Sequence, residues 1–466
     1  MKDTCEKRKY LAVFLLIFLL AGCNRSELRT EVRRTVRLDP RNPVTLTIWH
    51  PYQQRMRVIM DELINEFNST VGAERGIIIR DSYVARNAEI SSALMSAADG
   101  VPGAPGLPDI SVVYPGVAMI MEDKGLLVDL SAYFSAEELS QYVPAFVEEG
   151  TLGRTRGSRR ALYIMPVAKS TEVLFVNATM FNRFAADVDG ITLSALATFE
   201  GLQETAKKYY EWSGGKSFVY YKDLFNYSLA GFNQLGGSLL AETPMRFNVS
   251  SEIFRRVWDG YFPGAVKGGL AIFDGYGSQL MATGETVAIL DTTASIAFLS
   301  NTVTFADNTR EEYELAILPY PVFQGGEKAA IQQGGGMCVF KSDARREYAA
   351  AVFLKWFTSP EQNIRFTLGI GYMPVATQAF NEFLQKQTEN IADENIRKLI
   401  NVKVTMQQQY RFIYPSPVHN IDEETRFAYE RAMRTAAENA RQDYLGGTAF
   451  ETVSAQALER FITGMR

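Results

Sequence analysis

The stretch VTLTIW, residues 44–49, alternates apolar and small polar side chains with the two-residue period of a β-strand. The next segment, MRVIMDELINEFNS (56–69), carries apolar residues at helical spacing, and GIIIRDSYV follows it as a second strand. A helix over 87–100 then precedes DISVVY (109–114), a β-branched run typical of a buried strand. This alternation predicts an α/β fold with a largely parallel sheet and right-handed crossovers.

The same alternation returns further along the chain. Strands are expected at 170–177 and 285–290, with helices over FEGLQETAKKYYEW and DLFNYSLAGFNQLGG between them. Strands resume from YELAILPYP through GGGMCVF, and a helical final third begins near residue 346. We therefore expect a second α/β lobe.

Composition restricts the function classes. The 466 residues carry a net charge of -5, and 47% of them are hydrophobic, enough for a large core in two or three domains. A mildly acidic chain lacks the basic face that nucleic-acid binding requires, so no nucleic-acid partner is expected. Only two histidines, His50 and His419, are present, which argues against histidine-centred metal sites and catalytic triads.

The N-terminus has the pattern of an export signal. A basic cluster precedes an apolar run over 10–22, which is shorter than the roughly 20 residues that a membrane span needs. Residues 1–22 therefore read as a signal peptide, and Leu20-Ala21-Gly22-Cys23 closely resembles a bacterial lipobox, in which the cysteine thiol carries a diacylglycerol. The alternative is an ordinary signal with a chance cysteine. Residues 23–43 would be the lipidated N-terminus and its charged tether, and Cys338 is left without a disulfide partner.

Seven segments, in this order and spacing, resemble the extracellular solute-binding proteins of bacterial carbohydrate-type ABC importers. They are VTLTIWH with NEFN, LPDISVV with GLLVDLS, MPVAKSTEVLFVN, GETVAILDTTAS, LAILPYP, GGGMCVF with AAAVFLKWFTSPEQN, and GYMPVATQAF. The resemblance covers nearly all of residues 44–465. Within the family the chain is most similar to glycerol-3-phosphate-binding proteins, through the Trp49-His50 pair and the Gly371-Tyr372-Met373-Pro374 loop.

This resemblance implies a two-lobed periplasmic-binding-protein fold of type II character, with an interlobe ligand cleft that closes about a hinge. Three hinge crossings are implied, near residues 167–171, 333–336 and 372–376. The implied parts are 44–168 and 335–373 for the N-lobe, and 169–334 and 374–466 for the C-lobe.

The candidate ligand contacts come from the same resemblance and from the residue types. Tyr372 and Ser170 match contacts of the glycerol-phosphate binders, whereas Trp49 could stack on a sugar ring or pack between the lobes. Arg411, with Arg426 as its competitor, could clamp an anion, and a solvated surface arginine is the alternative for either. The expected ligand-binding residues are Trp49, Asn87, Ser170, Tyr220, Tyr221, Thr292, Thr293, Gly335, Gly336, Tyr372 and Arg411.

Each of the other candidates has a structural alternative. Tyr220 and Tyr221 could pack in the core, Thr292 and Thr293 could serve a turn, and the glycines could form only a pliable hinge. Two positions depart from the glycerol-phosphate pattern. Asn87 stands where that family has a ligand tyrosine and Pro115 where it has a ligand glutamate, which implies a different polyol end of the pocket.

The resulting hypothesis is a substrate-binding lipoprotein of an ABC importer. It would capture a glycerol-phosphate-like solute (glycerol 3-phosphate or a glycerophosphodiester) or a sugar and deliver it to permease subunits served by a cytoplasmic ATPase. A disaccharide or oligosaccharide receptor is the main alternative, and an exported carbohydrate-active enzyme or an adhesin are others. We expect a monomer without cofactor, metal or catalytic residues, exported and anchored by lipid to the periplasmic side of the cell membrane. SGGKS (213–217) resembles part of a phosphate-binding loop, but Tyr210 stands where that motif needs glycine.

Overall fold

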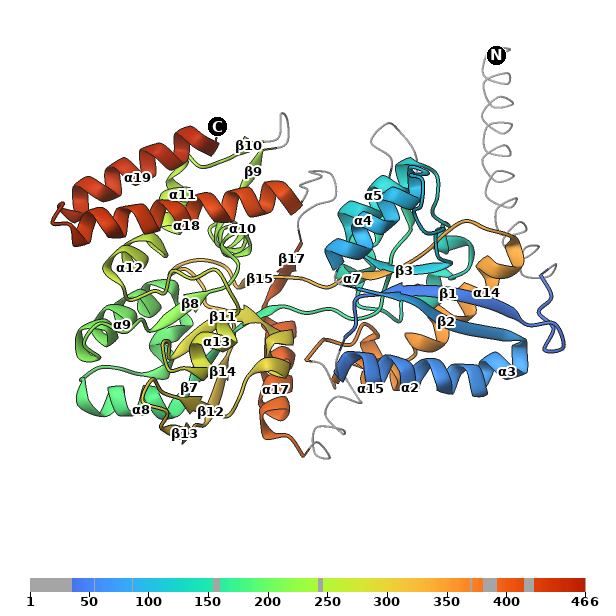
Figure 1. Cartoon of the computed structure of the whole chain (residues 1–466), viewed down its shortest axis with the longest axis horizontal. Helices are drawn as coiled ribbons and strands as arrows, with labels where there is room; N and C mark the ends of the chain where they lie inside the picture. Colours follow the sequence, from blue (N-terminus) through green and yellow to red (C-terminus); the bar gives the residue numbers. More distant parts are fainter. Residues whose placement is uncertain are drawn as a thin grey trace, which may run out of the picture. The chain divides into compact units, whose positions relative to one another are not determined.

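The computed structural model describes residues 36–53, 55–85, 87–153, 160–241, 246–368, 371–379, 392–414 and 423–465 (Figure 1). The chain divides into two compact units: unit 1 comprises Met1–Pro166 and Gly336–Gln362, and unit 2 comprises Val167–Gly335 and Asn363–Arg466. The chain therefore changes unit three times. The expected signal peptide, Cys23 and the first part of the tether lie outside the described residues, as does His419.

A five-stranded sheet forms the centre of unit 1, in the order β2-β1-β3-β16-β6. Its strands are β1 (Val44–His50), β2 (Ile77–Val84), β3 (Ile110–Val113), β16 (Gly336–Val339) and β6 (Met165–Pro166). β1 runs parallel to β2 and β3, whereas β16 runs antiparallel to β3 and β6. Alternate residues of β1, such as Leu46, are buried because one face of the strand points into the core.

Helices cover the sheet of unit 1 (Figure 1). In α2 the buried residues Met60, Leu63 and Phe67 recur at helical spacing, and the Phe67 ring packs edge-on against Phe353 of α14, with ring centroids 5.1 Å apart. The unit contains α2 (Arg55–Ser69), α3 (Val71–Arg75), α4 (Asn87–Ala98), α5 (Pro115–Asp123), η1 (Leu130–Ala132), α6 (Ala136–Leu139), α7 (Pro144–Glu149), α14 (Ala344–Phe357) and the ribbon β4 (Thr151–Leu152) with β5 (Ala161–Leu162).

Unit 2 has a four-stranded sheet in the order β14-β7-β11-β8. Its strands are β7 (Glu172–Asn177), β8 (Val219–Tyr221), β11 (Ala288–Thr292) and β14 (Leu315–Leu318). β11 is parallel to β8, but β7 is antiparallel to both β11 and β14. The α/β fold and the second α/β lobe are confirmed, and the largely parallel sheet expected for the first region does not recur in this unit. β7 enters the sheet directly after a change of unit, so no helical crossover within the unit sets its direction.

Helices and short ribbons complete unit 2, and the long helices α18 and α19 pack against each other (Figure 1). Its helices are α8 (Ala178–Asp187), η2 (Leu193–Ala197), α9 (Phe199–Trp212), α10 (Leu224–Gln234), α11 (Glu252–Asp259), α12 (Phe262–Lys267), α13 (Gly277–Ala282), η3 (Thr293–Phe298), α17 (Glu394–Gln409), α18 (Glu423–Leu445) and α19 (Phe450–Met465). Its ribbons pair β9 (Leu240–Ala241) with β10 (Arg246–Phe247), β12 (Thr302–Thr304) with β13 (Arg310–Glu312), and β15 (Ala329–Ile331) with β17 (Arg411–Ile413). In the described part of the chain, none of the helices has the length and apolar character of a membrane span.

The third change of unit falls inside helix α15 (Pro360–Leu368), whereas the sequence places it near 372–376. Asn363 explains the earlier position. Its side-chain amide donates to the Val167 carbonyl oxygen at 2.7 Å, and its side-chain oxygen accepts from the Val375 backbone N–H at 2.8 Å. These two bonds attach the second half of α15 to unit 2.

Candidate functional site

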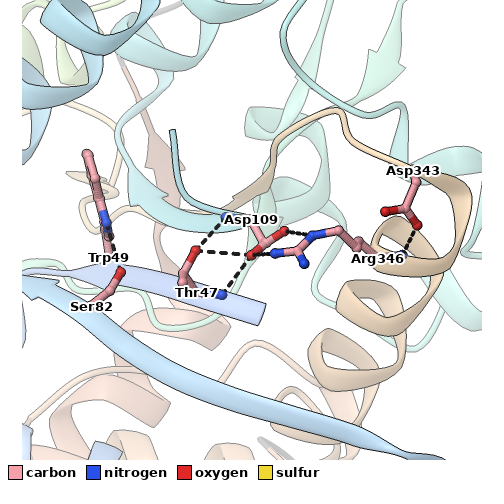
Figure 2. Close-up of polar contacts among 6 residues, drawn as sticks. All are labelled: Thr47, Trp49, Ser82, Asp109, Asp343 and Arg346. Atoms are coloured by element: carbon pink, nitrogen blue, oxygen red, sulfur yellow. Dashed lines mark hydrogen bonds and ion pairs between the residues drawn. The ribbon is translucent and has the colours of Figure 1, made fainter. Parts of the chain in front are cut away.

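An ion pair between the buried Asp109 and the half-buried Arg346 holds the strands of unit 1 to α14 (Figure 2). The Arg346 guanidinium donates from Nε and Nη2 to the two carboxylate oxygens of Asp109, at 2.7 and 2.6 Å. The same carboxylate accepts the backbone N–H and the hydroxyl of Thr47, at 2.7 and 3.0 Å. Because Asp109 is only 7% exposed, this network fixes the start of β3 against β1 and α14.

Trp49 packs in the core of unit 1, and its side chain is 3% exposed. The β1–β2 pairing shifts register between Ile48 and Trp49, so that Ser82 is the extra residue of a β-bulge. The indole N–H donates to the Ser82 hydroxyl oxygen at 3.1 Å (Figure 2). Trp49 is buried because side chains such as Ile90 and Leu94 of α4 cover it, and the sequence pattern of β1 alone could not reveal this cover or the bulge on β2.

His50 follows Trp49 at the carboxyl end of β1, and its imidazole is fully buried. Neither ring nitrogen has a hydrogen-bond partner among the described residues, and the ring stacks on Tyr52 with centroids 5.3 Å apart. Burial lowers the pKa of His50 to about 4, so the ring is neutral at physiological pH. Asn87, a further candidate of unit 1, is the first residue of α4 and is half-buried.

In unit 2 the two crossing segments, 167–171 and 332–335, lie side by side. Ser170 and Gln333 exchange two backbone hydrogen bonds, of 2.9 and 2.8 Å. The Lys169 ammonium donates to the Gly334 carbonyl oxygen at 2.8 Å, and Met373 donates its N–H to the Lys169 carbonyl oxygen at 2.5 Å. Candidate Ser170 is therefore held beside the candidate glycines and the loop that carries Tyr372.

The loop of Tyr372 also approaches the candidate threonines. Gly371 has a φ of +75°, and a Cβ atom there would lie 2.6 Å from the Thr293 carbonyl oxygen, so only glycine fits. Thr293 in turn donates its N–H to the Thr171 carbonyl oxygen at 2.8 Å. Thr292 caps η3. Ser170, Thr292, Thr293 and Tyr372 thus belong to one edge of unit 2, which we call the polar edge.

Lys403 holds the Tyr372 loop through hydrogen bonds. This buried side chain of α17 donates from Nζ to the carbonyl oxygens of Gly371 and Tyr372, at 3.3 and 2.7 Å. Burial lowers the pKa of Lys403 from its usual 10.5 to about 7. The sequence gives no signal for this role, because a lysine in a helix is usually a solvated residue.

Four carboxyl groups gather at the polar edge, and the sequence analysis missed them all. Glu172 begins β7, Asp223 follows β8, Asp291 lies in β11 and Glu430 lies on α18. Burial, followed by the neighbouring carboxylate Asp223, raises the pKa of Glu172 and of Glu430. Burial also raises the pKa of Asp291 to about 6. Their signal in the sequence was weak, because each is a single acid at the end of a strand or within a helix.

Arg426 of α18 lies among these acids. Its Nη2 donates to the Asp223 carboxylate at 3.3 Å and to the Asn226 side-chain oxygen at 3.2 Å. Arg411 is placed differently: it is exposed on β17, where Nη2 lies 3.7 Å from the Glu327 carboxylate and 3.4 Å from the Asn233 carbonyl oxygen. The two arginines of the anion-clamp hypothesis are thus each paired with an acid.

The remaining candidates lie in regular structure. The Tyr220 hydroxyl donates to the carbonyl oxygens of Phe273 and Gly275, both at 3.2 Å, and Tyr221 is buried in the aromatic core. Both positions match the core-packing alternative. Gly336 begins β16 in unit 1, and Gly335 is the half-buried last residue of the preceding segment of unit 2.

A protein-family model for bacterial extracellular solute-binding proteins matches residues 62–393. The chain belongs to this family. Among curated proteins, none is similar enough in sequence to this solute-binding protein to count as a relative.

Solved structures resemble the solute-binding protein over nearly its whole length. The cyclic α-maltosyl-1,6-maltose-binding protein of Arthrobacter globiformis has a TM-score of 0.66 at 16% identity, covering 91% of this chain and 99% of the other. UgpB of Mycobacterium tuberculosis, in complex with glycerophosphocholine, has a TM-score of 0.63 at 16% identity, with coverages of 91% and 98%. An ABC substrate-binding protein of Listeria monocytogenes, in complex with cycloalternan, has a TM-score of 0.64 at 15% identity, with coverages of 91% and 99%. At identities this low, the structural likeness shows a shared two-lobed solute-binding fold and nothing about the ligand of this chain.

Proposed function

We propose that this chain is the substrate-binding component of an ABC importer and that it captures a sugar. The observation that carries the proposal is the polar edge of unit 2. Hydroxyl groups of Ser170, Thr292 and Thr293 lie there with the Tyr372 loop. Such groups hydrogen-bond to sugar hydroxyls, and a phenol ring can pack on the apolar face of a sugar.

The charges of the polar edge favour a neutral solute over a phosphate. A phosphate site needs cations or N–H groups that are free to bind it. Arg426 already pairs with Asp223, and Arg411 pairs with Glu327 away from the polar edge. A phosphate placed among Glu172, Asp223 and Asp291 would also meet like charges whenever these groups are ionised. We therefore place a sugar, including a disaccharide or oligosaccharide, ahead of glycerol 3-phosphate.

A glycerophosphodiester is the second candidate. The Trp49-His50 pair and the Gly371-Tyr372-Met373-Pro374 loop favour it, since these are the segments most similar to the glycerol-phosphate binders. The Glu172 carboxyl and its neighbours would then face the part of the solute remote from phosphate. Trp49, Asn87, Ser170, Thr292, Thr293, Gly335, Gly336 and Tyr372 remain our proposed contacts in either case.

Export and anchoring complete the proposal. The signal over residues 1–22 would direct the chain out of the cytoplasm, and acylation of Cys23 would hold a monomer at the membrane beside its permease. Each buried CH₂ of an acyl chain adds about 0.8 kcal/mol to membrane binding. Mass spectrometry of the mature N-terminus tests this: a diacylglycerol adduct on Cys23 supports it, and an unmodified Cys23 refutes it.

Thermal unfolding of the chain from Asn24 tests the solute class. The panel comprises maltose, maltotriose, glycerol 3-phosphate and glycerophosphocholine. A solute at about 1,000 times its dissociation constant should add about 4 kcal/mol to the free energy of unfolding. A rise in Tm with the sugars alone supports the first proposal, and a rise with the phosphates alone supports the second. Conversion of a sugar to product would refute a transport receptor and indicate an enzyme.

A further inference from the structure

Glu172 is a buried carboxyl group without a cation of its own. Its side chain is 4% exposed, and no ion pair joins it to a cation among the residues that the structure describes. Arg426, the nearest candidate, directs Nη2 to Asp223 and Asn226 instead. A buried carboxylate that lacks a counter-ion is costly, and taking up a proton removes that cost.

The hydrogen bonds of Glu172 lead straight to a crossing segment. Its Oε1 accepts from the Gln333 side-chain amide at 3.0 Å and from the Asn226 side-chain amide at 2.8 Å. Gln333 is the residue whose backbone pairs with Ser170, and the next residue, Gly334, accepts from Lys169. One carboxyl group therefore links α10 to both crossing segments within unit 2.

We propose that Glu172 is a positioning residue that, in its protonated form, holds the Gln333 crossing segment against Ser170. This role rests on the proposed function, because the Gln333 segment lies at the polar edge where the solute would bind. The arrangement of that edge would then depend on the proton of Glu172. Glu172 need not touch the solute, because it acts through Gln333.

The groups that face Glu172 favour the protonated form. Burial is the largest cause of the raised pKa of Glu172, and Asp223 at the start of α10 and Asp291 in β11 add to it. The hydrogen bond from Asn226 and the charge of Arg426 on α18 lower it. Burial, followed by the charge of Glu172, raises the pKa of Tyr320, which follows β14. Glu430 adds a further acid on α18.

The sign of the pH effect follows from this arrangement. The folded state holds the proton of Glu172 above the usual carboxyl pKa of 4.5, whereas the unfolded chain has released it. The contribution of Glu172 to stability is therefore full below that pH and falls as pH rises toward the raised folded pKa.

Three variants of the ligand-free chain test the proposal. Glu172→Gln keeps a carbonyl oxygen as the acceptor but has no ionisable proton. The free energy of unfolding of this variant should therefore lose the part of its pH dependence that is due to Glu172. Glu172→Leu removes the acceptor and should expose the Gln333 and Ser170 amides to hydrogen exchange roughly tenfold faster. Glu430→Gln is the control: it alters a nearby acid that does not bond to Gln333 and should leave that exchange unchanged.

Infrared spectroscopy detects the protonation state of a carboxyl group, which a purely structural role of Glu172 would not require to be neutral. Because burial also raises the pKa of Glu430, the Glu430→Gln variant isolates the signal: at neutral pH it should show the carbonyl stretch of a protonated buried carboxyl group, and the Glu172→Gln, Glu430→Gln double variant should lack that band. An absent band, or a Glu172→Gln variant with the wild-type pH dependence, overturns the proposal.

Solute binding is measured in a separate experiment. A chain that binds neither maltotriose nor glycerophosphocholine counts against the proposed function, while the measurements without ligand still decide the role of Glu172.

Discussion

Removing the Asp109 carboxylate should destabilise unit 1 by about 3 kcal/mol. The carboxylate accepts four hydrogen bonds, two from Arg346 and two from Thr47. Losing one partner of a buried pair costs about 3–5 kcal/mol, and the lower end applies because the Arg346 side chain is 36% exposed and can regain water. We therefore expect Asp109→Ala to lower the free energy of unfolding by about 3 kcal/mol.

Guanidinium unfolding followed by tryptophan fluorescence measures this effect, since Trp49 and Trp356 report on unit 1. Asp343→Ala is the matched control, because Asp343 only caps α14 by accepting from the Arg345 and Arg346 N–H groups, which is worth about 1 kcal/mol. A double-mutant cycle with Arg346→Ala should show a coupling energy above 1 kcal/mol. A cost for Asp109→Ala no larger than that of Asp343→Ala, or additive single changes, would refute the reasoning.

Three further predictions concern unit 2. Lys403→Met should flatten the rise in the free energy of unfolding between pH 7 and pH 10, because the folded state sheds the Lys403 proton near pH 7 while the unfolded chain keeps it; unfolding curves from pH 6 to 10 that stay parallel for the two proteins would contradict this. Gly334→Ala should lower stability by about 1–3 kcal/mol, since φ is +99° and the new Cβ would lie 2.6 Å from the Ala168 oxygen. Calorimetry would compare it with Gly190→Ala, which has positive φ but open space, and equal losses would exclude the contact. Tyr220→Phe should cost about 1 kcal/mol of stability, because it removes the hydroxyl that donates to the Phe273 and Gly275 carbonyl oxygens while Gly275 keeps the Lys222 ammonium as a donor, and an unchanged Tm would argue against those bonds.

The sequence predicted the layered α/β fold because hydrophobic periodicity is local. Strand 44–49 and the helix after it could be read from side-chain alternation alone, and both are present as β1 and α2. The antiparallel direction of β7 was not predictable in this way, since it depends on where the chain enters unit 2. The bulge beside Trp49 was not predicted for a related reason: its extra residue, Ser82, lies on the neighbouring strand.

The residues of the candidate site differ in how clearly the sequence points to them. Ser170, Thr293 and Tyr372 were chosen from motif resemblance, and the structure brings their segments together through backbone contacts. The acids at the polar edge were missed, because Glu172 and Glu430 lie far apart in sequence and only the fold brings them near Asp223. Lys403 was missed for the same reason.

Isothermal titration calorimetry of the chain from Asn24 with maltotriose, against glycerophosphocholine as the charged comparison, tests the central claim most directly. The account predicts saturable binding of the sugar at one site per chain, weak or absent binding of the phosphodiester, and recovery of the sugar unchanged. Tight binding of glycerophosphocholine with no heat from the sugar would contradict the charge argument built on Asp223 and the two paired arginines.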